Sequence, residues 1–172
     1  MPKIHSVSGY SNHMGILIST MVHTRRNTFF LVKGLSIKQL DHNIDNISNS
    51  IGTLLLHICA LEYQHTLAHL LKKKLSVDEW KKYENALGVK MNERLVKNND
   101  LDYYVNEMTR VRDITLRELK NLDDKWLFEE LEFSNGFSTN NYYLIRHIID
   151  DELCHQGQIK FIKRRLKSDD TV

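Results

Sequence analysis

Histidine and acidic side chains lie close together near the end of the chain, at a spacing that suits metal binding. Asp151 and His155 are four residues apart in a segment with helical periodicity. Residues four apart lie on one face of an α-helix, about 6 Å apart along its axis, so the two side chains could share one ion. His147 lies roughly 12 Å from His155 along the axis, which is too far for the same ion.

A third candidate ligand, His57, lies in the apolar run LLLHICAL at 54–61. Such a run is expected to be buried, and a buried imidazole needs a polar partner. Two imidazoles and one carboxylate from facing helices, with a position open for water, form the ligand set of a catalytic zinc-type or nickel-type site. The opposing interpretation is a core histidine that is hydrogen-bonded to protein neighbours and binds no metal.

Glu152 competes with Asp151 for the inward-facing position. The last helical segment carries a heptad pattern with spacings of 3, 4, 3, 4, 3 and 4 residues. The pattern consists of Ile145, Ile148, Glu152, His155, Ile159, Ile162 and Leu166. Because a heptad stripe faces the interior of a helical bundle, it favours Glu152 as the more inward carboxylate and places Asp151 at the edge.

A ferritin-like di-metal centre is another alternative. Such a centre takes a Glu-x-x-His motif from each of two helices and a glutamate from each of the other two. The chain has the motif twice, from Glu62 to His65 and from Glu152 to His155. The first helical segment, residues 14–33, contains no aspartate or glutamate, so one required carboxylate is missing. The sequence therefore disfavours a site with two ions.

Four long amphipathic patterns must position these side chains. Gly34 is a typical helix stop, and Ser48 and Ser50 are typical N-caps. Ser76 and Glu79 have the spacing of a capping box, which predicts a short additional helix between the second and third long ones. The predicted helices cover residues 14–33, 48 or 50 to 73, 76–88, 100–119 and 138 or 139 to 167.

Helices of these lengths favour an all-α fold, a four-helix bundle. The segment 74–99 is long enough to cross the bundle, which argues against four helices that alternate up and down through tight loops. Residues 121–137 are predicted to form a connection with a short turn and a break at 134–136. We expect one domain over residues 14–167, an irregular lead-in over 1–13 and a flexible C-terminal tail over 168–172.

The composition argues against several other classes of protein. The 172 residues carry 24 basic and 22 acidic side chains, and a net charge of +2 is low for a nucleic-acid-binding protein with a dense basic face. The apolar runs are much shorter than a membrane span. Two cysteines and the lack of a recognisable secretory signal predict a cytoplasmic protein.

The last helical segment resembles that of the DinB family of bacterial four-helix-bundle proteins. In this family a histidine is followed, after one residue, by Gly-Gln-Ile and a basic and apolar tail. The matching residues here are His155, Gly157, Gln158 and Ile159. The segment IGTLLLHICALEYQ at 51–64 is similar to the second helix of the family, and residues 99–119 are similar to the third.

The resemblance implies a single divalent ion, such as zinc, nickel or manganese, held by three residues and by water. His57 matches the ligand on the second helix, and His155 matches the ligand on the last. The third ligand of the family is usually a histidine four residues before the last one, and Asp151 occupies that position here. We therefore expect His57, Asp151 and His155 to bind the metal. Glu152 is expected to support these ligands or to act as a catalytic proton acceptor.

The resemblance also implies an activity class. Members of the family resemble metal-dependent transferases that use a small intracellular thiol such as bacillithiol, or related hydrolases. A divalent ion lowers the pKa of a bound thiol or water and so yields a nucleophile at neutral pH. We expect a small-molecule substrate, no nucleic-acid or membrane partner, and a homodimer. The alternative is a non-catalytic bundle or dimerisation protein with a vestigial metal site.

Overall fold

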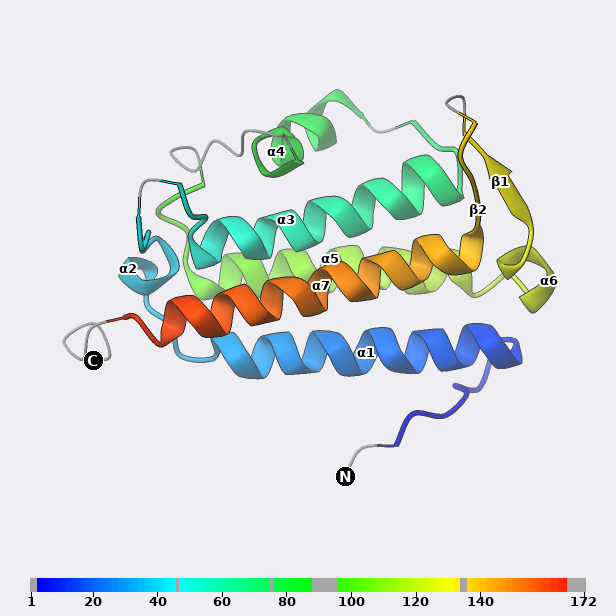
Figure 1. Cartoon of the computed structure of the whole chain (residues 1–172), viewed down its shortest axis with the longest axis horizontal. Helices are drawn as coiled ribbons and strands as arrows, with labels where there is room; N and C mark the ends of the chain where they lie inside the picture. Colours follow the sequence, from blue (N-terminus) through cyan, green and yellow to red (C-terminus); the bar gives the residue numbers. More distant parts are fainter. Residues whose placement is uncertain (1–2, 46, 75, 88–95, 134–135, 167–172) are drawn as a thin grey trace.

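Four long helices form the centre of the computed structural model, which describes residues 3–45, 47–74, 76–87, 96–133 and 136–166 (Figure 1). The long helices are α1 (Asn12–Val32), α3 (Ile51–Gln64), α5 (Leu101–Leu119) and α7 (Asn141–Lys163). The shorter helices are α2 (Ile37–Leu40), α4 (Val77–Leu87) and α6 (Asp124–Leu127). The predicted all-α four-helix bundle with a short extra helix between the second and third long helices is confirmed.

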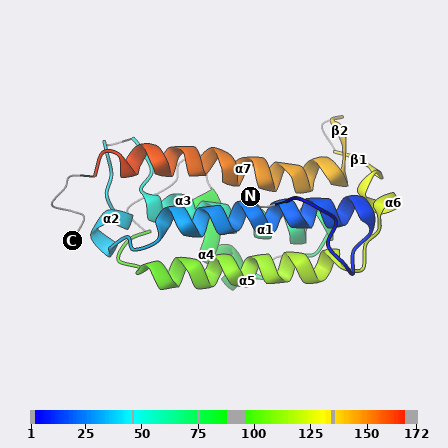
Figure 2. The same cartoon turned by 90° about the horizontal axis from the view of Figure 1, so that it is seen from below.

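The four long helices do not simply alternate in direction. Helices α3 and α5 run one way along the bundle, and α1 and α7 run the other way (Figure 1). Each of α3 and α1 packs against both α5 and α7, and Figure 2 shows α1 lying between those two helices when seen from below. Because α3 and α5 are parallel, the connection between them returns along the bundle, and its helix α4 packs on α3. The length of segment 74–99 predicted such a crossing.

Several helices begin or end at the residues that the sequence predicted. Ser50 Oγ accepts a hydrogen bond from the backbone N–H of Thr53 at 3.2 Å, so Ser50 rather than Ser48 caps α3. Ser76 and Glu79 form the predicted capping box, with reciprocal backbone contacts of 3.2 and 3.1 Å. Gly34 adopts a φ of +77°, a left-handed conformation that favours glycine just beyond the end of α1.

Two segments differ from the predicted elements. The second long helix leaves the α-helical form after Gln64 and continues as a π-helical segment, η1 (His65–Leu70). The connection before α7 contains a hairpin of β1 (Glu130–Glu132) and β2 (Ser138–Asn140), paired antiparallel, which we did not predict. Because β2 occupies the expected helix start, α7 begins at Asn141, and the Asn140 side chain caps it by accepting from the Tyr143 N–H at 2.9 Å.

Some predicted features fall outside the described residues. These are the end of the short helix at Gly88, residues 134–135 of the predicted break, and the tail over 168–172. Residues 3–11 of the lead-in form no helix or strand, and α1 begins at Asn12. Among the described residues, no helix combines the length and the apolar character needed to cross a bilayer.

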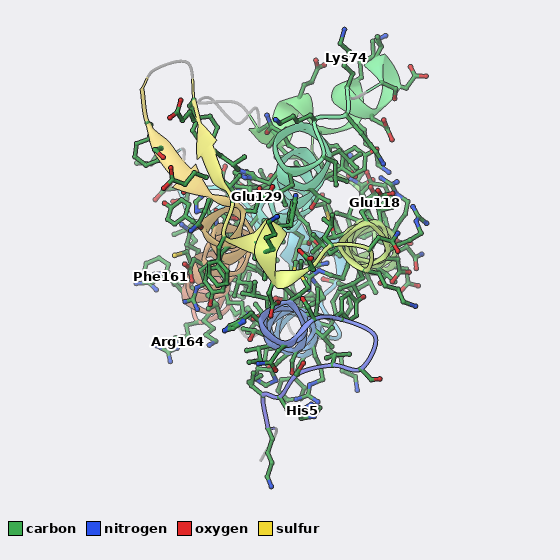
Figure 3. All side chains as sticks on the ribbon, turned by 90° about the vertical axis from the view of Figure 1, so that its right-hand side faces the viewer. His5, Lys74, Glu118, Glu129, Phe161 and Arg164 are labelled. Atoms are coloured by element: carbon green, nitrogen blue, oxygen red, sulfur yellow. The ribbon has the colours of Figure 1, made fainter. Side chains whose placement is uncertain are left out.

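Two clusters of apolar side chains fill the bundle, one toward each end. On α1, Met14 and Met21 belong to one cluster and Val32 to the other, and on α7 the same division falls between Ile149 and Ile159. The end-on view in Figure 3 shows side chains filling the space between the long helices. The heptad prediction for α7 agrees with the burial of Ile145, Ile148, Glu152, His155, Ile159 and Ile162.

Candidate metal centre

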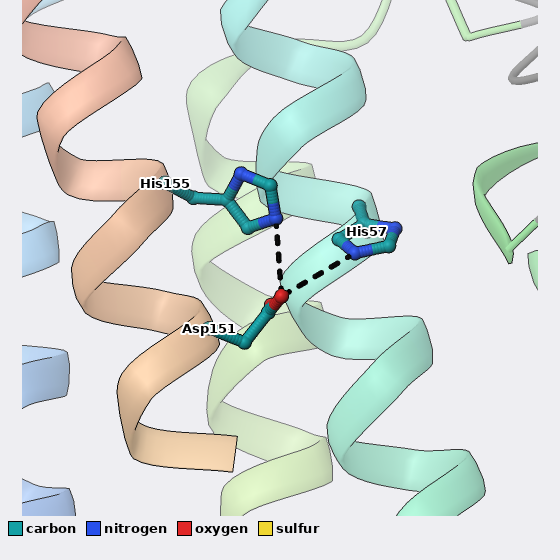
Figure 4. Close-up of side chains that lie close together, drawn as sticks. All are labelled: His57, Asp151 and His155. Carbon is teal, nitrogen blue, oxygen red and sulfur yellow. Dashed lines mark ion pairs between the residues drawn. The ribbon is translucent and has the colours of Figure 1, made fainter. Parts of the chain in front are cut away.

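Three predicted ligands lie together between α3 and α7. His57 projects from α3, and Asp151 and His155 project from successive turns of α7 (Figure 4). Asp151 Oδ1 lies 3.4 Å from His155 Nε2 and 3.8 Å from His57 Nε2. The two imidazole rings meet edge to face, with 4.8 Å between their centroids. The structure therefore places side by side the three residues that the sequence predicted as ligands, a group that we call the triad.

Two protein oxygen atoms orient the imidazoles of the triad. His57 Nδ1 lies 2.6 Å from the carbonyl oxygen of Ala86, in the last turn of α4, where carbonyl groups lack a partner within the helix. His155 Nδ1 lies 3.0 Å from Oε1 of Gln158, one turn later on α7. Because each oxygen accepts a hydrogen bond, each Nδ1 carries a proton, and each Nε2 on the other side of its ring faces the carboxylate of Asp151. This arrangement is typical of histidines that bind a metal through Nε2.

Asp151 is incompletely satisfied by its protein neighbours. Its second carboxylate oxygen, Oδ2, is buried and has no hydrogen-bond partner among the described residues. Burial alone would raise the pKa of Asp151, but hydrogen bonds and charge interactions with His155 and His57 outweigh it, and the pKa lies below its usual range. For His57, burial alone would lower the pKa, but contacts with Asp151 and the Ala86 carbonyl raise it. Asp151 is therefore an ionised carboxylate with one oxygen left to bind a further group.

The donor set of the triad fits a divalent ion. One donor atom from each of the three residues can be chosen so that all three lie within 4.8 Å of one another. Two imidazole nitrogens and one carboxylate oxygen suit zinc, nickel and manganese, and three protein ligands leave positions for water or a substrate. The side chains of His57, Asp151 and His155 keep 14%, 16% and 10% of their surface exposed, so the group is in contact with solvent over a small part of its surface.

Glu152, the residue next to Asp151, lies in a different cluster. Its side chain is fully buried and contacts Arg25 Nε at 2.8 Å, Thr28 Oγ1 at 2.6 Å and Arg112 Nη2 at 3.1 Å. These contacts occupy both carboxylate oxygens, which favours the supporting role over that of a proton acceptor. The catalytic role of Glu152 stays a prediction.

Glu62 completes this cluster, which we call the buried tetrad (Arg25, Glu62, Arg112 and Glu152). Glu62 accepts from Arg25 Nη2 at 2.7 Å and from Arg112 Nε at 2.7 Å. Burial alone would raise the pKa of Glu62, but the charges of Arg112 and Arg25 outweigh it and lower the pKa to about 2. The tetrad has two positive and two negative side chains, one from each long helix, so its charges balance inside the core.

The tetrad also bears on the di-metal alternative. Glu62 and Glu152, the glutamates of the two Glu-x-x-His motifs, both bind guanidinium groups. On α1, the helix without an acidic residue, Arg25 fills the place where a di-metal site needs a carboxylate. These contacts agree with the sequence in disfavouring a two-ion site.

Arg25 and Arg112 were not predicted from the sequence as functional residues. A signal for Arg25 was present, because Met14, Ile18, Met21, Arg25, Thr28 and Val32 follow heptad spacing on α1 and are all buried. Arg112 likewise continues the buried stripe of α5 from Met108 to Thr115. A charged residue at such a position predicts a buried partner of opposite charge.

His147 on α7 and His65 on η1 contact each other rather than the triad. His147 stacks on Tyr143, with an interplanar angle of 3°, and its ring centroid lies 5.3 Å from that of His65. His65 is the first residue of η1. Neither belongs to a described group of three or more potential ligands, so the structure brings together only His57, Asp151 and His155 in that way.

Comparisons with known proteins agree with this fold. A search of curated proteins found no significant match. Among solved structures, a conserved protein from Enterococcus faecalis superposes with a TM-score of 0.69 at 12% identity, covering 87% of this chain and 94% of the other. At that identity the match supports the fold alone. The model of the DinB family matches residues 10–166, which include all four long helices, and the chain therefore belongs to the DinB family.

Proposed function

We propose that the protein is a metal-dependent enzyme that binds one divalent ion through His57 Nε2, His155 Nε2 and the carboxylate of Asp151. The observation that carries this proposal is the orientation of the three side chains of the triad. Ala86 and Gln158 hold both Nδ1 atoms, both Nε2 atoms face Asp151, and Asp151 Oδ2 has no partner among the described residues. A histidine kept only for packing would not need its second nitrogen aimed at a half-satisfied carboxylate.

The chain supports this chemistry by orienting and charging the site. The carboxylate of Asp151 offsets part of the charge of a divalent cation, and α4 and Gln158 restrict rotation of the imidazoles. A bound divalent ion would supply Lewis acidity, which lowers the pKa of a thiol or water in an open position. Within the buried tetrad, Arg25 and Arg112 bind Glu152, the neighbour of Asp151, and these contacts hold the rotation of α7 so that Asp151 and His155 face α3.

The reaction that we propose is attack of the sulfur of a small thiol, of the bacillithiol type, on an electrophilic carbon of a small molecule. A C–S bond forms, the leaving group departs with the electron pair of the bond that breaks, and the thiol proton passes to solvent. The alternative reaction at the same site is hydrolysis, in which water takes the place of the thiol as the nucleophile. The partial exposure of all three ligands supports access by either nucleophile. Location in the cytoplasm, where such thiols occur, and assembly as a homodimer remain predictions of this proposal.

Metal titration tests the binding step. Isothermal titration of metal-stripped protein with Zn²⁺, Ni²⁺ and Mn²⁺ should give one ion per chain for at least one metal. Asp151→Ala should weaken binding by about 100-fold or more, because one ligand and one charge are lost. The matched control is Asp150→Ala on the same helix, since Asp150 is half exposed and pairs only with Arg146 in the described contacts. Absence of binding to the wild type, or equal binding by both variants, would overturn the proposal.

Turnover tests the catalytic step. Metal-loaded protein is incubated with bacillithiol and monochlorobimane, and separately with p-nitrophenyl acetate and no thiol. Thiol conjugation or ester hydrolysis that disappears in Asp151→Ala supports the enzyme and identifies the nucleophile. Stoichiometric metal binding with neither activity would instead favour the non-catalytic bundle.

A further inference from the structure

A cavity of about 570 Å³ lies against α7, and it is lined by Gln158, the residue that contacts His155 of the triad. Its walls come from α3, α7 and the segment before α3, and they include Ile44, Leu54, Cys154, Gly157, Gln158 and Phe161. The volume lies within the range of small-molecule sites, roughly 300–1,000 Å³. In Figure 3, Phe161 points outward from α7, which places this wall at the surface of the bundle rather than in its core.

The cavity and the triad share a wall. Gln158 lines the cavity, and its Oε1 accepts the hydrogen bond from His155 Nδ1 at 3.0 Å. Leu54 lies about one helical turn before His57 on α3, since the two are three residues apart. A molecule in the cavity therefore lies beside α3 and α7, the helices that carry the triad. It can contact the Gln158 side chain, which in turn contacts His155.

The side chains of the cavity define the chemistry of its ligand. Among the described residues that line it, none is Asp, Glu, Lys, Arg or His. An ionised ligand would lose hydration there without gaining a charged partner, which is unfavourable. Apolar walls such as Ile44 and Leu54 remove apolar surface from water, while Ser48 and Asn49 offer hydrogen bonds. The lining therefore favours an uncharged and partly apolar molecule.

Gly157 keeps part of this cavity open. A Cβ atom built on Gly157 would meet no other heavy atom within 4 Å. The residue lies inside α7, where glycine is less favourable than alanine by about 1 kcal/mol, and its backbone has no need of a left-handed conformation. A larger side chain at this position would project into the cavity without striking the fold.

We propose that this cavity is the substrate pocket of the metal site and binds an uncharged, partly apolar small molecule, the electrophile of the reaction. The assignment of this ligand as the substrate rests on the proposed function. The binding of a neutral ligand next to Gln158 rests on the cavity alone, and the two parts can be tested separately.

Fluorescence titration with two matched probes tests the proposal. N-phenyl-1-naphthylamine is neutral, and 8-anilino-1-naphthalenesulfonate has the same ring system with a sulfonate group. The neutral probe should bind metal-free wild type at least about 10-fold more tightly, because the sulfonate finds no charged partner in the cavity. Gly157→Leu should weaken the neutral probe by about 10-fold or more, since leucine fills the open space. The control Arg164→Leu adds the same side chain at the exposed C-cap residue of α7, which does not line the cavity, and should leave the affinity for the neutral probe unchanged.

Gly157→Ala keeps the test decisive if the leucine variant does not fold. Alanine is the better helix former and meets no neighbour, so this variant should fold and should weaken the neutral probe by a smaller factor. Equal binding of the neutral probe to wild type and to the folded Gly157 variants would overturn the cavity assignment, and equal binding of both probes would overturn the neutral class. Probe binding without metal binding would leave the cavity standing and defeat the proposed function. Metal binding and turnover that Gly157→Ala does not change would defeat only the substrate assignment.

Discussion

Asp151 and Glu152 are neighbours in the sequence, yet they belong to two clusters with opposite properties. Glu152 enters the buried tetrad, where both of its oxygens bind arginine or threonine donors. Asp151 enters the triad at the edge of the bundle, where one of its oxygens has no partner among the described residues. Two residues in succession on a helix point about 100° apart, which is enough to send one carboxylate inward and the other toward a site open to solvent.

The comparison separates charges that stabilise the fold from charges available for chemistry. The tetrad balances two positive and two negative groups and satisfies them within the protein. The triad brings one carboxylate and two imidazole Nε2 atoms together, and one oxygen of the carboxylate has no partner among the described residues. We therefore expect substitutions in the tetrad to change the free energy of unfolding, and substitutions around the triad to change metal affinity.

The largest expected effect is on stability, from Arg112→Ala. Removing this guanidinium leaves the buried carboxylates of Glu62 and Glu152 with one arginine between them. Breaking a buried ion pair in this way costs about 3–5 kcal/mol of unfolding free energy. Urea denaturation followed by circular dichroism measures the change. A loss below about 1 kcal/mol, as for an exposed ion pair, would remove the distinction between the clusters.

The second-largest expected effect is a loss of folding stability at low pH, through Glu62 of the tetrad. The pKa of Glu62 is lowered to about 2 in the folded protein, below its value in an unfolded chain. The folded state therefore favours the ionised form, and this contribution to stability is complete above about pH 5 and lost as the pH falls toward 2. Denaturation midpoints measured between pH 7 and pH 3 should fall in the wild type. Glu62→Gln should be less stable at pH 7 and should show a shallower decline with acid, and an equally steep decline would contradict the assignment.

Gln158→Ala should change metal affinity more than stability. The variant loses the acceptor that orients His155 Nδ1, and losing such a partner weakens metal binding by about 10-fold to 100-fold. Because Gln158 is exposed on α7, the unfolding free energy should move by less than about 1 kcal/mol. Zinc titration and urea denaturation on the same preparation give both values. Unchanged zinc affinity would show that the imidazole is held without the amide.

Lys73→Ala should have the smallest effect on the free energy of unfolding, and it serves as the reference for an exposed ion pair. Lys73 pairs with Glu118 at 2.8 Å, but its side chain is 53% exposed. Such a pair contributes about 0–1 kcal/mol, and salt screens it. Urea denaturation at low and high salt should show a small difference that vanishes at high salt. A loss comparable to that of Arg112→Ala would mean that burial is not what distinguishes the tetrad.

Much of the fold could be predicted because its signals are local. The capping box at Ser76, the stop at Gly34 and the heptad of α7 each depend on residues a few positions apart. The hairpin before α7 was missed because its strands are three residues each, too short for a recognisable alternation. The change from α-helix to η1 also lacks a signal in the apolar pattern, which continues through it.

The site was predictable only in part, for a similar reason. His57, Asp151 and His155 could be proposed from helical spacing and a family resemblance. The Ala86 carbonyl that holds His57 could not, because it comes from the end of another helix and belongs to the backbone, which leaves no residue-type signal. The pairing of Arg25 and Arg112 with two glutamates requires the mutual rotation of four helices, which no single segment encodes.

The π-helical segment η1 marks a position at which this helix can gain or lose a residue. A π-helical turn holds one more residue than an α-helical turn, so such a segment marks a place where a helix tolerates an inserted residue. Deleting one residue within 65–70 could restore ordinary winding there while leaving His57, two turns upstream, in register with α7. The two halves of this helix can thus vary independently, since the upstream half keeps His57 in place beside Asp151 and His155 while the downstream half is shortened or extended.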